Sequence, residues 1–446
     1  MKNNVLRLLA VLLTLACVAS VVACSGQQEP NDESLTDPVI EDTDPTDETE
    51  NSDTTDSSAE EESWESAEED STEESSTEEE TEAGPAEFAI QINEGDNGCT
   101  IVSLVSRPTS VVTVPAELGG YPVIAIGDGA FKDQTVPTQI ILPETVTKIG
   151  SSAFHGCTSL VGVNIPEGVE SIGQFAFAGC SKLVSVTLPA SVTSVGESAF
   201  SSCNWLESVT VLGNIISVPT SLFWNCQKLG TVVLPDTVET IGENAFYECR
   251  SLTDFTMPAG VREIAPYAFW CCAALETVDI PDEVTAIGEF AFAGCEKLTA
   301  VTIPGGISEI SASCFSTCKG LTTLVIPANV DSIGASAFWG CLGLNTVIIE
   351  DGVATIQAGA FDTCTGLKTV VLGRWIESVG EGAFAATALE TVFYNGSSLD
   401  WESVEMTEGT IAPELVYFYA EELPEEEGNF WFYDGDTPAK WPAVVA

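Results

Sequence analysis

Cysteine is the residue whose type and spacing most directly suggest chemistry in this sequence. Ten of the 15 cysteines recur at intervals of 23 residues: Cys157, Cys180, Cys203, Cys226, Cys249, Cys272, Cys295, Cys318, Cys341 and Cys364. Such thiols can form disulfides, bind metal, or fill a buried column as small apolar side chains. No C-x-x-C pair occurs, so we expect no metal site. We predict buried free thiols, with disulfides between adjacent turns as the alternative, because stacked strands lie about 4.8 Å apart.

Other groups that could support catalysis are few. His155 is the single histidine, and H-x-C with Cys157 is a poor metal signal. Asp434-Gly435-Asp436 hints at calcium but lacks the rest of a binding loop. The sequence contains no P-loop, no G-x-G-x-x-G and no nucleophile elbow. We therefore predict no catalytic residues, no cofactor and no enzymatic activity.

The cysteine ladder belongs to a repeat that must position every other side chain. Phenylalanine occurs at 23-residue steps at Phe131, Phe154, Phe177, Phe200, Phe223, Phe246, Phe269, Phe292, Phe315, Phe338, Phe361 and Phe384. The unit reads L-x-x-V-x-I-P-x-x-V-x-x-I-G-x-x-A-F-x-x-C. Alternation in V-x-I predicts a strand that proline ends, whereas V-x-x-I-G predicts a short extended or turning segment. A-F-x-x-C predicts a 3₁₀ or short helical turn. One unit cannot bury its apolar face, so the units must stack.

This pattern resembles the leucine-rich repeats of the bacterial BspA-like class, whose 23-residue units carry I-G-x-x-A-F-x-x-C and a proline after the strand. The match covers about residues 110–395. The resemblance implies a leucine-rich repeat solenoid with one parallel β-strand per repeat, short turn or 3₁₀ segments on the convex side, and caps at both ends. It also implies a bacterial surface protein. Leu212, Glu350 and Gly373 depart from the pattern by replacing the proline.

The solenoid, about 12 repeats over residues 127–393, needs caps because its core is open at both ends. Residues 88–126 contain Phe88–Ile92, an Asn97-Gly98 turn signal and Thr100–Val102, which together predict a cap hairpin. Residues 394–446 are rich in aromatic side chains, including Trp401, Trp431 and Trp441. We expect these aromatics to form a cap on the last turn; a sugar or partner site is the alternative.

Two surfaces are candidates for binding. The resemblance places the strand residues between the apolar ones on the concave face, where hydroxyl side chains recur at Thr187, Thr210, Thr231, Thr256, Thr277, Thr302, Thr323, Thr346 and Thr369. This face could bind protein, glycan or ice, or threonine could simply suit an exposed strand. The second surface follows the phenylalanine column and holds Trp224, Tyr247, Trp270 and Trp339. These aromatics predict either partner contact or packing between turns.

The N-terminal sequence predicts a signal peptide that directs the chain to the membrane. Residues 1–23 have a short basic start followed by an apolar run, and small residues precede Cys24. This arrangement resembles a bacterial lipobox, which implies that Cys24 is the lipid anchor; Cys17 is a weaker candidate. The alternative is ordinary secretion after cleavage nearby. We therefore expect a bacterial cell-membrane protein that is lipid-anchored on the extracellular side.

Charge separates a tether from the repeats. The formal net charge is −54, and residues 25–87 hold 26 of the 68 acidic residues and no lysine or arginine. Residues 24–87 are predicted to be a disordered Ser/Thr/Glu tether, because they cannot bury enough apolar surface to fold. The tether is interpreted as a solubilising spacer, or as an acidic ligand or cation sponge. So few basic residues exclude nucleic acid as a partner and exclude polybasic docking on membranes.

These observations favour a monomeric, lipid-anchored extracellular repeat protein. Relatives in the resembled class are associated with adhesion, which implies binding to an extracellular protein or glycan. The alternative is a structural cell-envelope spacer without a specific ligand. A fold alone does not determine which applies.

Overall fold

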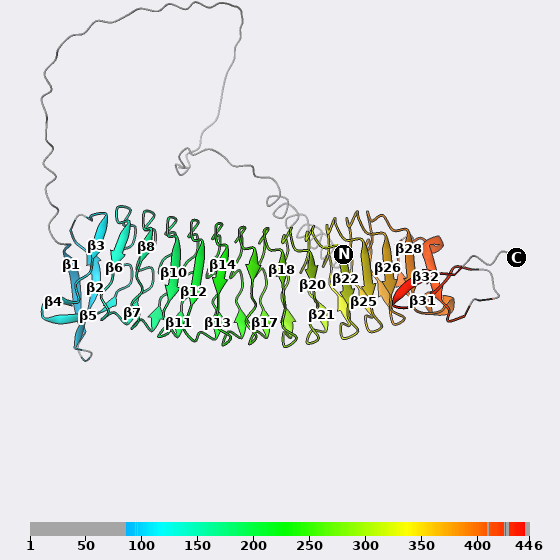
Figure 1. The fold of residues 1–446 in the computed structure, drawn as a ribbon, viewed down its shortest axis with the longest axis horizontal. Coiled ribbons are helices and arrows are strands. Elements are labelled where there is room, and N and C mark those ends of the chain that lie inside the picture. Colours follow the sequence, from blue (N-terminus) through cyan, green and yellow to red (C-terminus); the bar gives the residue numbers. More distant parts are fainter. Residues whose placement is uncertain are drawn as a thin grey trace, which may run out of the picture. The chain divides into compact units, whose positions relative to one another are not determined.

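The computed structural model describes residues 86–441 apart from 94, 96, 107, 408–409, 423 and 425–427. The predicted signal peptide, the anchor Cys24 and all but the last two residues of the predicted tether lie outside the described residues. The described part is a stack of similar turns that follow one another along the sequence (Figure 1). Each turn contributes a short strand to each of two parallel ladders.

The first ladder consists of the V-x-I strands. Its first sheet contains β3 (Val111–Thr113), β6 (Gln139–Ile141) and β8 (Gly162–Val163). The second contains β10 (Ser185–Leu188), β12 (Ser208–Val211), β14 (Thr231–Val233), β16 (Asp254–Phe255), β18 (Thr277–Val278) and β20 (Ala300–Val301). The third contains β22 (Thr323–Ile326), β24 (Thr346–Ile349), β26 (Thr369–Leu372) and β28 (Thr391–Tyr394), and three strands of the C-terminal cap continue it. Most neighbours in the repeats pair in parallel at a 23-residue offset, as Val186 does with Val209. The parallel strand predicted for each repeat is confirmed.

A second parallel ladder comes from the V-x-x-I segment of each unit, which a glycine follows in most units. Its strands are β5 (Tyr121–Ile126), β7 (Lys148–Ile149), β9 (Ser171–Ile172), β11 (Ser194–Val195), β13 (Ser217–Val218), β15 (Thr240–Ile241), β17 (Glu263–Ile264), β19 (Ala286–Ile287), β21 (Glu309–Ile310), β23 (Ser332–Ile333), β25 (Thr355–Ile356), β27 (Ser378–Val379) and β29 (Glu405–Met406). Most are two residues long. The glycine that follows such a strand lies too close to the preceding turn to carry a side chain. A Cβ on Gly173, for example, would lie 2.4 Å from the Ser151 nitrogen in that turn.

The A-F-x-x-C segments are turns, and no 3₁₀ helix occurs in those that the structure describes. Positions two before and two after each phenylalanine have positive φ, as in Ser152 (54°) and Gly156 (72°). The left-handed residues and the phenylalanine donate to the next turn, as Phe154 N–H does to Ala176 O at 2.7 Å. The residues between them bond within their own turn, as His155 N–H does to Ser152 O at 3.1 Å. This alternation satisfies the backbone without a helix.

The core is a set of columns along the stack. Rings of successive phenylalanines from Phe131 to Phe384 stack with centroids 4.9–6.0 Å apart. All twelve are at most 4% exposed, and the ten ladder cysteines are fully buried beside them. The repeat columns read from the sequence therefore form one continuous core.

Both ends carry additional elements. At the N-terminal end, β1 (Phe88–Asn93) and β2 (Gly98–Leu104) form an antiparallel hairpin, β4 (Glu117–Leu118) pairs with β5, and Phe88 meets Phe131 edge-on at 6.1 Å. At the C-terminal end lie α2 (Ser398–Trp401), η1 (Pro413–Leu415), β30 (Val416–Tyr419), β31 (Phe430–Asp434) and β32 (Thr437–Lys440). Strands β30 to β32 extend the first ladder.

Candidate functional site

The predicted threonines lie along the outward side of the first ladder, which we call the threonine face. The strands alternate buried and exposed residues, as in the pattern of β22, so that successive threonines share one side. Thr187, Thr231, Thr256, Thr277, Thr302 and Thr323 are exposed, whereas Thr210, Thr346 and Thr369 are half-buried. Parallel pairing aligns them in columns, as Thr323 pairs with Thr346 and Thr346 with Thr369.

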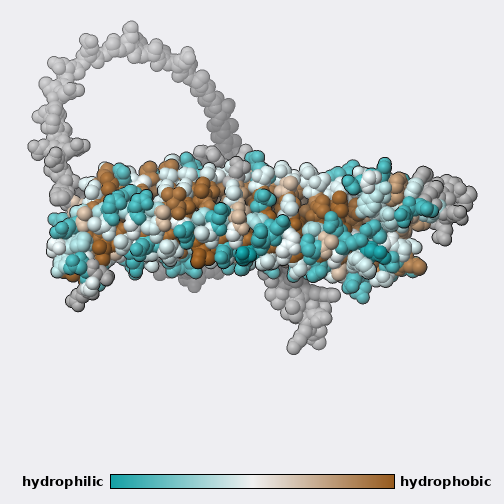
Figure 2. Space-filling model, turned by 60° about the horizontal axis from the view of Figure 1, so that its bottom comes forward, coloured by the Kyte–Doolittle hydropathy of each residue, from teal (hydrophilic) through white to brown (hydrophobic). Residues whose placement is uncertain are grey.

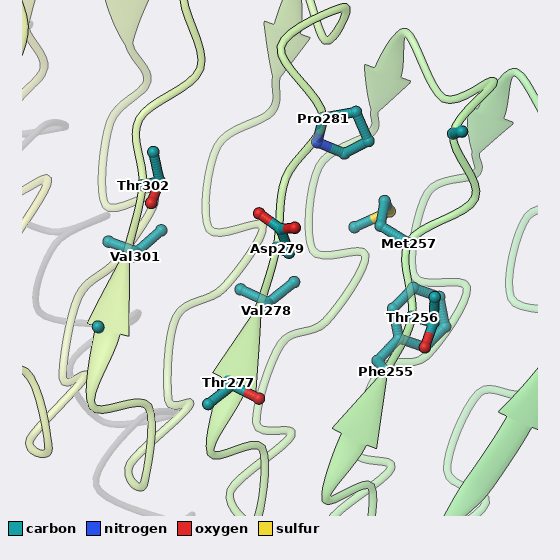
Figure 3. Close-up of a pocket in the computed structure, with 11 residues that line it drawn as sticks. Phe255, Thr256, Met257, Thr277, Val278, Asp279, Pro281, Val301 and Thr302 are labelled. Atoms are coloured by element: carbon teal, nitrogen blue, oxygen red, sulfur yellow. The ribbon is translucent and has the colours of Figure 1, made fainter.

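A groove lies on this face, with a volume of about 690 Å³. Thr256, Thr277 and Thr302 line it, and Asp279 stands between them (Figure 3). The volume is within the range of small-ligand sites. Asp279 occupies the column of Thr256 and Thr302, one turn from each. Sequence reasoning missed this carboxylate, although it interrupts a column of hydroxyl side chains.

The groove coincides with shorter strands. Strands β16, β18 and β20 are two residues long, whereas β10, β12, β22 and β24 have four. Here Phe255 takes a core position that holds Val209 and Val232 in the two preceding turns, and its ring meets Phe246 and Phe269 edge-on at 5.2 and 4.9 Å. The groove therefore lies where the strands of the first ladder are shortest and a larger side chain enters the core.

The groove offers hydroxyls that donate and accept hydrogen bonds, and one carboxylate that accepts them. Its floor includes apolar atoms of Met257 and Val278, each 6% exposed. Polar groups above a small apolar floor suit a ligand that carries hydrogen-bond donors. Within the described ranges, no group of three or more His, Cys, Asp or Glu side chains is placed to hold a metal ion.

The predicted aromatic surface is only partly assembled. Trp224, Tyr247 and Trp270 stack in sequence, with centroids 6.1 and 4.3 Å apart. Trp270 is 4% exposed and Trp224 is 38% exposed, and burial raises the pKa of Tyr247 to about 12. Trp339 makes no ring contact with this stack in the part of the chain that the structure describes. Packing between turns therefore accounts for Trp270, while Trp224 stays partly exposed.

The C-terminal aromatics pack as a cap. Trp431 is fully buried, contacts Phe393 at 5.2 Å, and donates its indole N–H to Tyr394 O at 2.9 Å. Phe432 stacks on Trp441 at 4.0 Å. The Asp-Gly-Asp motif is the tight turn of the β31–β32 hairpin, in which Asp434 pairs with Thr437.

The ladder thiols have a structural role. The ten ladder cysteines are free, and each donates its thiol to the carbonyl of the phenylalanine 26 residues earlier, at 3.1–3.4 Å. Burial raises the pKa of Cys226 to about 12. His155 Nδ1 lies 3.9 Å from the Asp133 carboxylate.

The side of the solenoid seen in Figure 2 mixes apolar and polar side chains, with several small apolar patches instead of one continuous apolar face. Of the helices within the described ranges, none has the length and apolar character needed to cross a bilayer.

Stacked parallel strands repeated every 23 residues, with little helix, define a leucine-rich repeat solenoid. The family model for the BspA type leucine rich repeat region, built of six copies, matches residues 124–237, 216–345 and 299–403. The chain belongs to this BspA-type family. The resemblance read from the sequence is thus confirmed.

The chain is similar to several solved structures, and the first of those described here supports the fold. A leucine-rich repeat protein from Bacteroides ovatus is 28% identical, with 70% of this chain and 88% of that chain covered and a TM-score of 0.60. A leucine rich cell surface protein from Faecalibacterium prausnitzii is 29% identical, with 73% and 97% covered and a TM-score of 0.41. No curated protein matches the chain.

Proposed function

We propose that this chain is a lipid-anchored extracellular protein whose threonine face binds a protein or glycan partner. The observation that carries the proposal is the groove of about 690 Å³ in which Thr256, Thr277 and Thr302 surround Asp279. Exposed threonines extend beyond the groove to Thr187 and Thr323. A larger partner could therefore contact several turns at once.

The anchor in the proposal rests on the sequence before Cys24, and the extracellular location follows from that anchor. An acidic tether of residues 24–87 would hold the repeats away from the membrane, because its charges repel one another and extend the chain. Two acyl chains on Cys24 would supply stable attachment.

A binding experiment tests the role of the face. The purified chain is applied to arrays of extracellular matrix proteins and glycans, beside Thr277→Glu/Thr302→Glu. We expect saturable binding of at least one array component, weakened about tenfold or more in the variant, because the longer glutamate side chains fill the groove and two new carboxylates must be desolvated when a ligand enters. Thr193→Glu/Thr285→Glu is the matched control: both threonines are exposed on a different side, and each bonds a backbone carbonyl of the preceding turn.

Two outcomes contradict the proposal. If both double variants bind as the unmodified chain does, the ligand does not use the threonine face. If no component binds the unmodified chain, the structural-spacer alternative is favoured.

A further inference from the structure

One turn of the solenoid differs from the others in the residues that follow its first-ladder strand. Positions 13 and 14 after each phenylalanine are small, polar or acidic in ten turns. The first of these positions holds Glu144, Glu167, Ala190, Gly213, Asp236, Ala259, Asp282, Gly305, Ala328 and Asp351. The turn after Phe361 instead has Arg374 and Trp375. Trp375 is 59% exposed, so packing of the core does not explain it.

These two residues border a cavity of about 420 Å³ where the last regular turn meets the C-terminal cap. Arg374 and Trp375 contribute one wall, Glu377 directly precedes β27, Glu405 begins β29, and Asp400 comes from α2. The paired residues Ser378 and Glu405 join β27 to β29, which fixes these elements relative to one another.

Hydrogen bonds to the backbone of Arg374 fix the cationic side of the cavity. Arg374 N–H donates to the Asp351 carboxylate at 2.8 Å, and the Tyr394 hydroxyl donates to Arg374 O at 3.1 Å. The guanidinium carbon lies 4.9 Å from the centre of the Trp375 ring. No carboxylate lies within 4.0 Å of this guanidinium in the described ranges. Its donors therefore remain available to a ligand.

The opposite side supplies acceptors. Asp400 Oδ2 accepts from Ser397 N–H at 2.9 Å and from its hydroxyl at 2.8 Å, so this carboxylate is oriented before any ligand arrives. Glu377 and Glu405 are exposed. Three carboxylates thus face one guanidinium, and the cavity is acidic overall.

We propose that this cavity binds a neutral oligosaccharide. Trp375 stays 59% exposed although the Arg374 guanidinium lies over its ring, so indole surface with negative π-density remains for the C–H groups of a pyranose ring. Arg374 donates hydrogen bonds to sugar oxygens, and Asp400, Glu377 and Glu405 accept them from sugar hydroxyls. A sugar that carries a carboxylate or sulfate would meet the excess of negative charge. The site is separate from the threonine face, and the inference does not depend on the function proposed for that face.

The test titrates the purified full chain with lactose, maltotriose and N,N′-diacetylchitobiose, with 3′-sialyllactose as the charged counterpart of lactose. We expect saturable binding of at least one neutral sugar, followed by calorimetry or by saturation-transfer NMR. Its Kd should rise about tenfold or more in Trp375→Ala and in Arg374→Gln. Trp205→Ala is the matched control: Trp205 is 51% exposed with Lys228 Nζ 4.0 Å from its ring centre, and its loss should change Kd less than twofold.

Three results would overturn the inference. One is failure of all three neutral sugars to bind at millimolar concentration. Another is binding that Trp375→Ala and Arg374→Gln leave unchanged. The third is sugar binding that disappears in Thr277→Glu/Thr302→Glu but persists in Trp375→Ala, which would assign the sugar to the threonine face and leave the proposed function standing.

Discussion

The thiol of Cys226 donates a hydrogen bond across 3.1 Å to the backbone carbonyl oxygen of Phe200, one turn earlier in the solenoid. That oxygen lies at a reversal of the chain, where the backbone changes between left-handed and right-handed conformations. The same contact recurs in every turn from Cys157 to Cys364. The ladder cysteines thus fill the core and also satisfy a backbone acceptor.

Cys249→Ala should destabilise the fold by about 1–2 kcal/mol, because it leaves a void and removes a donor from Phe223 O. Cys314→Ala is the matched control, since Cys314 is equally buried but stands where neighbouring turns have Ala291 and Ala337. We expect that change to cost less than about 1 kcal/mol. Urea unfolding measures both. Equal losses in the two variants would contradict a specific role for the ladder thiol.

Stability should fall as the pH rises above about 9. The pKa of Cys226 is raised by burial from 9.0 to about 12, so the unfolded chain releases the thiol proton first. The contribution is fully present below pH 9 and is lost progressively toward pH 12. At pH 10 the loss is about 1 kcal/mol for such a thiol. Unfolding midpoints at pH 7.5, 9 and 10 measure it, and Cys226→Ala should reduce the slope. A flat profile up to pH 10 would argue against buried thiols.

Ala386→Gly should stabilise the solenoid by up to about 1 kcal/mol. Ala386 has φ of 51°, a conformation that costs a residue with Cβ and costs glycine little. Its neighbour Ala385 is also exposed but has no positive φ, so Ala385→Gly should destabilise by about 0.5–1 kcal/mol. Thermal unfolding of both variants measures the difference: the midpoint should rise in Ala386→Gly and fall in Ala385→Gly. Shifts of the same sign would be inconsistent with a positive φ at residue 386 alone of the two.

Labelled palmitate should be incorporated into the chain in a bacterial host, and Cys24→Ala should abolish the label. The thioether and amide sites of a lipoprotein both belong to this cysteine, so no other residue can substitute. Cys17→Ala is the control and should retain full labelling. Label that persists in Cys24→Ala would remove the anchor from the proposal.

Most of the fold follows from period alone. The spacing of Phe131 through Phe384 predicts stacked turns, one parallel strand per turn and a buried cysteine column, because identical units can share a core only when their registers match. The glycine after Ile172 marks the close approach to Ser151. It does not reveal that Ser171–Ile172 pairs with both neighbouring turns, since two residues are too few for a periodicity signal.

The turns and the sites were harder to predict. Phe175 and Tyr267 adopt positive φ, which aromatic residues rarely do; hydrogen bonds to adjacent turns impose it, and a single unit cannot show them. Six of the predicted threonines are exposed on one face, yet their pattern does not mark the groove where Thr256, Thr277 and Thr302 surround Asp279. Arg374 and Trp375 line one cavity with Asp400 because α2 follows β28. Such an arrangement depends on tertiary structure and leaves no pattern in the sequence.

The most direct test of the threonine face is site-specific photo-crosslinking to the array component that binds the unmodified chain. A benzophenone side chain is placed at position 302, in the groove, or at position 285, on a different side. We predict a covalent adduct from position 302 that excess free ligand suppresses, and little adduct from position 285. Equal adducts from both positions, or an adduct from 285 alone, would contradict binding by the threonine face.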